Sequence, residues 1–355
     1  MRRVALVLGF LGVACAARFG PIYDDGVAGP NEKPLAELFD VWVAKHGKSY
    51  MDSNALGAKE EYTKRLGIFT TNWHFVAKLA EMKMNETWVL SFDGPLMDLH
   101  THEFEKMLGY VRPETSPNAL TEPTGFKYAD AEIAGAIDWR EKGAVTEVKD
   151  QGQCGSCWAF STTGSVEGVN FLHTGKLVSL SEQDLVSCDP KDKGCNGGIM
   201  EDAYTFIKSI GGVVTEEEYP YTSKGGDNSQ GCDTAKENAA ERVNVSGYED
   251  VPVGSEAALQ KAISNQPVSV AVAANLWQFY GGGVFNGLRG FCGKQVNHGV
   301  LAVGMNTKDA NPFYIVKNSW GAQWGEKGYI RLALNKAPTS GGQCEIASHA
   351  SYPLQ

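Results

Sequence analysis

The sequence lacks the features of a nucleic-acid-binding or membrane-spanning protein. The 355 residues carry a formal net charge of −10, and no block of basic residues is present that could release counterions from phosphates. No apolar run reaches about 18 residues, the length that a membrane-spanning helix requires. We therefore expect neither a nucleic-acid partner nor a membrane anchor, and we find no internal repeat.

The apolar segment at the N-terminus is too short to span a bilayer and has the form of a signal peptide. Arg2 and Arg3 precede an apolar run over residues 4–13, and small residues follow at 14–17. We predict a secretory signal peptide at residues 1–17, with a buried N-terminal strand or helix as the alternative. Glycosylation motifs at Asn85 and Asn244 agree with a secretory route to the extracellular space, a lysosome or a vacuole.

No cysteine occurs between the signal peptide and residue 154. Removal of the signal leaves seven, namely Cys154, Cys157, Cys188, Cys195, Cys232, Cys292 and Cys344. Seven is odd, so at least one thiol stays unpaired in a monomer, although an oxidising compartment favours disulfides. Cys154 and Cys157 form a C-x-x-C motif, but the partners that zinc would need and the βαβ context of a redox pair are missing. We expect no metal and no cofactor; zinc, redox chemistry and a structural disulfide through Cys157 remain the weaker alternatives.

Two helical patterns precede a linker. Apolar residues over 35–43 recur with helical spacing, and a longer helix is predicted from Glu60 to Met84. Residues 109–132 are rich in Pro, Thr and Glu, which predicts an exposed linker and a natural cleavage site.

Helices precede strands in the region after the linker. Helices are predicted at 156–170, 181–186 and 198–210, and short strands at 268–273, 299–303, 313–317 and 329–332. This order favours an α+β unit of two sub-lobes over a parallel α/β sheet.

Cys157 is the candidate nucleophile. A loop of small residues leads it to the start of the helix predicted at 156–170, where free backbone N–H groups and the helix dipole favour negative charge. A thiol in that position is expected to have a lowered pKa and to form the thiolate readily.

A catalytic thiol needs a base, and three histidines follow the linker. His173 lies in a polar turn and is expected to be solvated, whereas His298 opens a strand beside a glycine. Twenty residues later, Asn318 can hydrogen-bond one imidazole nitrogen, and Trp320 can keep water from that bond. Spacing alone leaves an alternative open, in which Asn318 belongs to a turn and the tryptophans beside it are core residues.

Together, Cys-Gly-Ser-Cys-Trp-Ala-Phe-Ser at 154–161, His298-Gly299 and Asn-Ser-Trp-Gly-x-x-Trp-Gly at 318–325 resemble the papain-like cysteine proteases of the cathepsin L/papain branch. The resemblance covers essentially the whole chain. It implies an α+β papain-like two-lobed fold at 133–355, with a helical lobe, a β-barrel-like lobe and a cleft between them. A helical inhibitory propeptide at 18–132, with a core of about 35–104, would precede it.

The resemblance implies a cysteine endopeptidase made as a zymogen. Cys157 would be the nucleophile, His298 its acid/base partner, Asn318 the orienting residue and Gln151 an oxyanion donor, with a turn residue as the alternative for Gln151. The implied disulfides are Cys154–Cys195, Cys188–Cys232 and Cys292–Cys344. Two other functions stay open, a catalytically silent binding protein and a transpeptidase that uses the same acyl-enzyme.

The resemblance also implies how substrate binds. Gly197 and Gly198 would hold substrate backbone. The residue before the cleaved one would enter a hydrophobic pocket that accepts Leu, Phe or Val, and the implied binding residues are Ile199, Met200, Ala271, Val296, His349 and Trp320. Protonated His349 would admit acidic side chains at low pH, unless it turns towards solvent. No long insertion separates Cys188 from Cys195, so an endopeptidase is expected rather than a carboxydipeptidase.

The pro-region is similar to the inhibitory propeptides of this family. Its helix carries the residues Glu61, Arg65, Phe69 and Asn72, with Val76 and Ala80 as departures from the family pattern. The next motif, at 92–98, keeps its Asp but loses the usual Gly, Asn and Phe. We expect the pro-region to inhibit the protease, with a strength that the sequence does not predict. Alternatively, the pro-region serves only folding. Expected partners are protein and peptide substrates, the chain's own propeptide and cystatin-like inhibitors, and the protease is expected to be a monomer with no further domain after Gln355.

Overall fold

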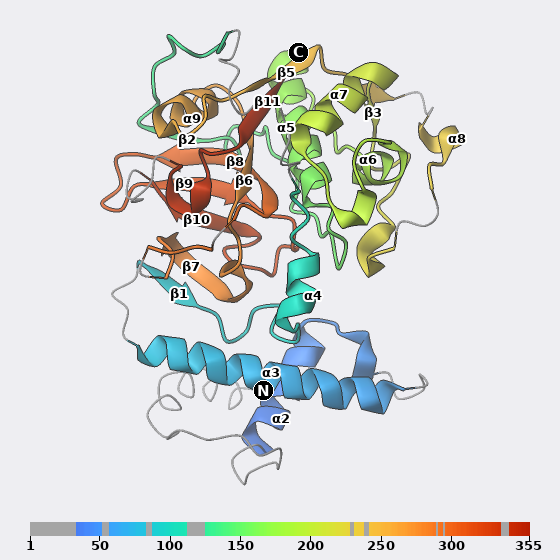
Figure 1. The fold of residues 1–355 in the computed structure, drawn as a ribbon, viewed down its shortest axis with the longest axis vertical. Helices are drawn as coiled ribbons and strands as arrows, with labels where there is room; N and C mark the ends of the chain where they lie inside the picture. The colour runs from blue at the N-terminus through green and yellow to red at the C-terminus, as the bar shows by residue number, and fades with distance from the viewer. Residues whose placement is uncertain are drawn as a thin grey trace. The chain divides into compact units, whose positions relative to one another are not determined.

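The computed structural model describes residues 33–51, 57–82, 87–111, 125–227, 231–237, 241–288, 290–293, 295–334 and 341–355. The predicted signal peptide and Asn85 lie outside these ranges. Contacts divide the chain into two units, one of residues up to 85 with Leu90–His100, the other of Glu86–Val89 with Thr101–Gln355 (Figure 1). Each unit is described separately.

The first unit is built on two of the predicted helices. α2 (Lys33–Lys45) and α3 (Ala58–Glu81) are joined through a 3₁₀ turn, η1 (Ser49–Met51). Phe39 and Trp42 on α2 place their rings 5.2 and 5.4 Å from the ring of Phe69 on α3. Both helices are confirmed to within a few residues, because their apolar stripes cover each other.

The segment with the altered motif is nonetheless held firmly in this unit. The Asp98 carboxylate is buried and accepts hydrogen bonds from Lys48 and Tyr50, each at 3.1 Å. The Asn72 amide donates to the carbonyls of Met97 and Leu99, each at 2.9 Å. Backbone carbonyls can be recognised in this way whatever side chains they carry, so the lost Gly, Asn and Phe do not release the segment.

The helices of the second unit include the three predicted after the linker. They are α4 (Thr101–Lys106), α5 (Cys157–Thr174), α6 (Glu182–Cys188), α7 (Met200–Ile210), α8 (Thr234–Glu237) and α9 (Glu256–Ile263). Ser181 caps α6 by accepting from the backbone N–H of Asp184 at 3.0 Å, and Gly175 ends α5 in the left-handed conformation with φ 73°.

The strands of the second unit form one large sheet and one small one. The large sheet contains β1 (Trp88–Leu90), β2 (Ala136–Asp138), β5 (Gly247–Asp250), β6 (Val268–Val272), β7 (Tyr280–Phe285), β8 (His298–Asn306), β9 (Phe313–Lys317), β10 (Tyr329–Ala333) and β11 (Ala350–Leu354). Its order is β1-β7-β10-β9-β8-β6-β11-β5, with β2 paired to β8, and its end strands β1 and β5 have no mutual pairing. β3 (Val213–Val214) and β4 (Arg242–Val243) form the small sheet.

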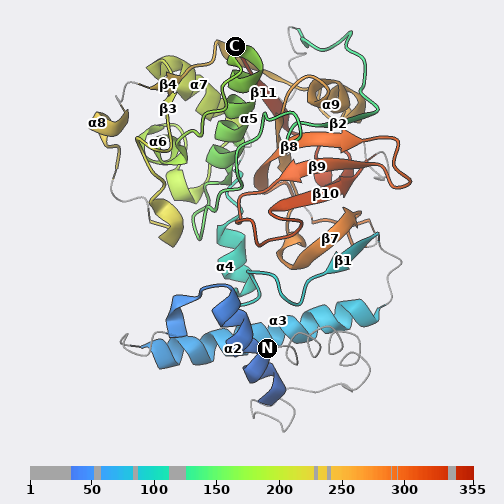
Figure 2. The same cartoon turned by 180° about the vertical axis from the view of Figure 1, so that it is seen from behind.

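Helices and strands gather on opposite sides of this unit, as the α+β prediction requires. Helices α5, α6 and α7 lie on one side and strands β6 to β10 on the other, and the view from behind agrees (Figure 2). The two sides meet where α5 crosses β8: the Ser161 hydroxyl donates to the Val300 carbonyl at 2.7 Å, and a Cβ on Gly164 would lie 2.9 Å from Leu301. Cys157 and His298 begin these two elements, so the crossing brings them together.

Three disulfides close the loops around the helices and the last strands. They join Cys154 to Cys195, Cys188 to Cys232 and Cys292 to Cys344, the pairs that the resemblance implied. Cys157 is free and buried.

Candidate active site

The Cys157 thiol lies at the first turn of α5 and is fully buried. The backbone N–H of Gly299 donates to its sulfur at 3.3 Å. The backbone amides of Cys157, Trp158 and Gly109 also hydrogen-bond the sulfur. The helix start therefore supplies donors to the thiol, as the sequence predicted.

These donors do not lower the pKa of the thiol in this form of the chain. Burial raises the pKa of Cys157 to about 11, and the backbone hydrogen bonds offset only part of that rise. The expectation of a lowered pKa is therefore wrong for the covered thiol. Desolvation, which the sequence does not reveal, outweighs the donors.

His298 is the first residue of β8 and is also fully buried. Its Nε2 lies 2.7 Å from Oδ1 of Asn318, which also accepts the backbone N–H of Ser319 at 2.8 Å. Because this Asn318 atom is an acceptor, Nε2 of His298 must be the donor, and Nδ1 keeps a lone pair. Nδ1 makes no hydrogen bond, and burial lowers the pKa of His298 to about 4.

Trp320 covers the bond between His298 and Asn318, as predicted. Its ring stacks on the imidazole with centroids 4.7 Å apart and is itself only 3% exposed. The exclusion of water strengthens a hydrogen bond and also penalises a charge on the ring.

Gln151, six residues before Cys157, is also fully buried. Its Nε2 donates to the carbonyls of Met107 and Cys154, at 2.8 and 2.7 Å. Its Oε1 accepts the hydroxyl of Ser319 at 2.6 Å, which fixes the orientation of the amide. The sequence analysis missed Ser319, although its place directly after Asn318 offered a signal.

A segment of the pro-region covers the thiol within the second unit. The Gly198 amide donates to the Gly109 carbonyl at 3.0 Å, and the Val111 amide donates to the Gly198 carbonyl at 3.2 Å. A Cβ on Gly109 would lie 1.8 Å from the carbonyl oxygen of Gly155. The backbone at residue 109 can therefore pass this close only as glycine. The prediction of an exposed linker is wrong at its start, because Tyr110 is only 4% exposed.

Tyr110 in this segment packs among the residues predicted to form a substrate pocket. It belongs to one buried cluster with Ile199, Met200 and Ala271, and Val296 packs against that cluster. The ring of half-buried His349 lies 6.0 Å from the Tyr110 ring, so the side chain of His349 lies beside this cluster.

A family model described as "Papain family cysteine protease" matches residues 133–354. The chain belongs to that family. It is 41% identical to the probable cysteine protease RD21B of Arabidopsis thaliana over 99% of this chain and 74% of that protein. It is equally identical to the KDEL-tailed cysteine endopeptidase CEP2 of the same plant, over 100% of this chain and 95% of the relative.

Solved proforms have the same fold as this papain-family protease. The proform of the ragweed pollen allergen Amb a 11 matches with a TM-score of 0.77 and 36% identity, over 92% of this chain and 96% of that one. Procathepsin L 3 from the larval midgut of Tenebrio molitor matches with a TM-score of 0.75 and 34% identity, over 90% and 99% of the two chains. The chain is therefore a cysteine endopeptidase made as a zymogen.

Beneath the active site, the protease contains a cluster of buried charges that the sequence analysis missed. Lys149 Nζ lies 2.7 Å from Glu182 and 3.4 Å from Glu167. The Thr146 hydroxyl donates to Glu167 at 2.6 Å and accepts Lys317 Nζ at 2.9 Å. Glu167 shares α5 with Cys157, while Lys149 and Lys317 lie within two residues of Gln151 and Asn318.

Mutual compensation keeps Lys149 and Glu167 of this cluster charged in the protease. The carboxylates of Glu182 and Glu167 raise the pKa of Lys149, against the effect of burial. Lys149 and Lys317 lower the pKa of Glu167. Burial, together with the charges of Glu167 and Glu216, raises the pKa of Glu182 to about 7, so Glu182 is the carboxyl that takes up a proton first.

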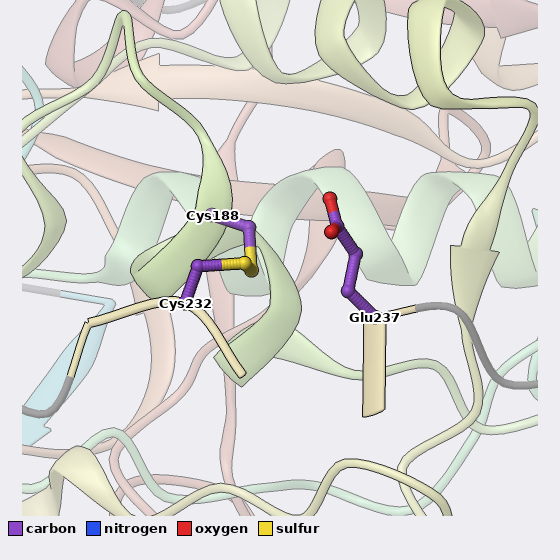
Figure 3. A group of neighbouring side chains, drawn as sticks. All are labelled: Cys188, Cys232 and Glu237. Atoms are coloured by element: carbon purple, nitrogen blue, oxygen red, sulfur yellow. A yellow bond between two sulfur atoms is a disulfide. The ribbon is translucent and has the colours of Figure 1, made fainter. Parts of the chain in front are cut away.

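Among the described residues of the protease, one group resembles a metal site, formed by Cys188, Cys232 and Glu237 (Figure 3). The two sulfurs form a disulfide, and zinc requires thiolates. This group is therefore no metal site. The described helices are each too short or too polar to span a membrane.

Proposed function

We propose that Cys157 cleaves peptide bonds after the segment at 101–111 has left the site. Its proton passes to Nδ1 of His298, and the sulfur bonds the carbonyl carbon of the substrate. His298 then protonates the leaving amine as the C–N bond breaks. Water, deprotonated by His298, attacks the thioester, releasing the acid product and the free thiol.

Gln151 would stabilise the oxyanion that forms during attack. Its Oε1 accepts the Ser319 hydroxyl, and its Nε2 donates to the Met107 carbonyl in the zymogen, so Nε2 is oriented to bind a peptide oxygen. The backbone N–H of Cys157 is the second donor. Donors of this kind typically contribute about 3–4 kcal/mol each to lowering the barrier.

One arrangement of groups in the site supports this proposal most strongly. A free thiol, a neutral imidazole with an unused nitrogen and an oriented amide lie around an extended piece of the chain's own backbone. The backbone N–H of Gly109 in that segment hydrogen-bonds the sulfur, so the segment occupies the space beside the thiol. The same contacts thus support both peptide binding and inhibition by the propeptide.

We also propose a preference for Leu, Phe or Val at the residue before the cleaved one. Tyr110 shares one buried apolar cluster with Ile199, Met200 and Ala271, which supports an apolar pocket in the processed protease. His349 at its border would admit acidic side chains when protonated. Cleavage of Glu- and Leu-bearing peptides across pH, in wild type and His349→Ala, tests this role, and unchanged selectivity would contradict it.

We infer a secretory route from the signal-peptide pattern and from the exposed position of Asn244. Asn244 lies in an N-x-S motif and is therefore accessible to glycosylation.

The decisive experiment starts from the full chain at pH about 4–5 with an epoxide thiol trap. We expect cleavage within the predicted linker near residues 125–136, labelling of Cys157 and hydrolysis of a Leu-bearing peptide amide. Cys157→Ser provides the control. Absence of labelling would favour a silent homologue, and products joined to an added amine would favour a transpeptidase.

A further inference from the structure

The glycine strip that holds backbone in the active site is supported from behind by two aspartates, of which Asp189 is buried and Asp192 is partly buried. Asp189 ends α6 and is 7% exposed, and Asp192 lies three residues later in the loop before Gly194. We propose that Asp192 is a positioning residue for substrate binding that keeps a proton and shares it with Asp189. This inference rests on the proposed function, because it concerns how the same site binds its substrate.

The hydrogen bonds around the pair require one proton between them. Asp189 Oδ1 accepts the backbone N–H of Lys191 at 2.9 Å, and Asp192 Oδ1 accepts that of Ile199 at 3.0 Å. The Oδ2 atoms of both aspartates are buried and receive no donor, and the two carboxyls lie close enough to interact with each other. A proton on Asp192 Oδ2 gives both atoms a partner, whereas two ionised carboxylates would leave both without one.

The surrounding charges favour this shared proton. Asp202 on α7 adds a further negative charge near the pair, and Lys191, which is mostly exposed, pairs with Asp202. Asp189 also accepts the backbone N–H of Asp192, so Asp189 is the member that has donors for a full charge. Burial first, and then the charge of Asp189, raise the pKa of Asp192 to about 8.

Asp192 reaches the substrate strip directly. Its carboxyl lies behind Gly198, where an added Cβ would come within 2.6 Å of Asp192 Cγ and Oδ1. Gly198 is the residue whose amide and carbonyl bind Gly109 and Val111. A shift of the Asp192 carboxyl therefore moves the two groups that bind extended backbone.

The sign of the pH dependence follows from the raised pKa. The proton is present at acidic and neutral pH and is lost as the pH rises through about 8. The pair then holds two negative charges beside Asp202, and their repulsion withdraws Asp192 from the Ile199 amide. Because Gly198 binds backbone away from the scissile bond, the expected change is in KM rather than in kcat.

The test uses the processed protease obtained by acid activation of the full chain, with active sites counted by epoxide titration. KM and kcat are measured from pH 5 to 9.5 on a Leu-bearing peptide amide. In wild type, KM should rise about tenfold above pH 7, the equivalent of one lost hydrogen bond. Asp192→Asn keeps the acceptor for Ile199 and gives Asp189 a permanent donor, so its KM should stay flat.

Two further variants keep the test decisive. In Asp189→Asn the new amide donates to Asp192, which can then ionise without repulsion, so KM should again stay flat even if Asp192→Asn fails to fold. Asp309→Asn removes a charge from an exposed loop and should behave as wild type.

A wild-type KM that is flat with pH, or an alkaline rise that persists unchanged in Asp192→Asn, would overturn the inference. Loss of epoxide titration would instead count against the proposed nucleophile. In that case the affinity of the processed protease for a synthetic peptide of residues 101–111 is measured across the same pH range. Its pH dependence tests the inference without catalysis.

Discussion

Two buried groups of titratable residues lie next to each other in the second unit, and their charge states differ although burial disfavours charge in both. Cys157 and His298 face no compensating charge, and burial drives both towards their neutral forms. In the cluster beneath, Glu167 is buried and Lys149 is largely buried, and both stay charged because each has a partner.

The difference shows that partners, rather than depth, decide the charge of a buried group. The cluster is complete within the folded chain, and it ties together the segments that carry Cys157, Gln151 and Asn318. We expect Cys157 and His298 to form an ion pair only when the covering segment leaves and water returns. In the zymogen, Cys157 and His298 are thus already in place but are held in their neutral forms.

Removal of the nucleophile should have the largest effect. Cys157→Ser should lower kcat/KM of the activated protease about 10⁵-fold, since a hydroxyl beside this imidazole is a far weaker nucleophile. Hydrolysis of a peptide amide by epoxide-titrated wild type gives the reference. Residual activity within tenfold of wild type would place the nucleophile elsewhere.

Exposure of the thiol should have the next largest effect. At pH 7 the covered Cys157 of the zymogen should react with iodoacetamide about 10³-fold more slowly than that of the processed protease, because it is held as the thiol. Gly109→Ala should speed alkylation of the zymogen, since its Cβ cannot fit against Gly155. Gly67→Ala, which meets no atom within 4 Å, is the control. Equal rates in all forms would contradict the comparison.

The charged cluster should matter for stability. Lys149→Met leaves Glu167 and Glu182 buried without their cation and should cost about 3–5 kcal/mol of unfolding free energy. Lys236→Met breaks an exposed pair with Asp233 and should cost less than about 1 kcal/mol. Urea unfolding of both variants in the Cys157→Ser zymogen measures the difference, and equal losses would disprove the role of burial.

The pH dependence of stability should report on Glu182. The pKa of Glu182 is raised to about 7 in the folded chain. Its stabilising contribution to the free energy of unfolding is therefore fully present below about pH 4.5 and is lost as the pH rises through 7. Glu182→Gln should remove about 2 kcal/mol of this pH dependence in urea unfolding between pH 4.5 and 7.5. Glu147→Gln, at an exposed position, should leave the profile unchanged. An unaltered slope in Glu182→Gln would assign the proton to another group.

Ser319 should show the smallest effect. Ser319→Ala removes the hydroxyl that orients Gln151 and should lower kcat/KM about fivefold to tenfold, the value of one hydrogen bond. Peptide hydrolysis by the activated variant measures it. Ser209→Ala, on the exposed face of α7, is the control for removal of a hydroxyl. An equal fall in kcat/KM in both variants would contradict the role of Ser319.

Long elements with a regular apolar pattern were predictable, and short ones were not. α3 and α5 were found because their own residues specify a helix. β7 was missed because its Gly281–Gly283 run has poor strand propensity, yet Gly283 is needed there: an added Cβ would lie 2.5 Å from the Thr87 carbonyl. α4 has six residues and places Phe104 against Trp320, so tertiary contacts rather than propensity explain it.

The sequence by itself determined the family, the odd cysteine and the candidate residues around it, because these depend on residue types in a fixed order. The tertiary structure alone decided the state of those residues. It placed Gly109 on the thiol, joined Ser319 to Gln151 and assembled Lys149, Glu167, Glu182 and Lys317 from separate segments. Desolvation and charge pairing depend on distances in space, and those distances exist only once the chain has folded.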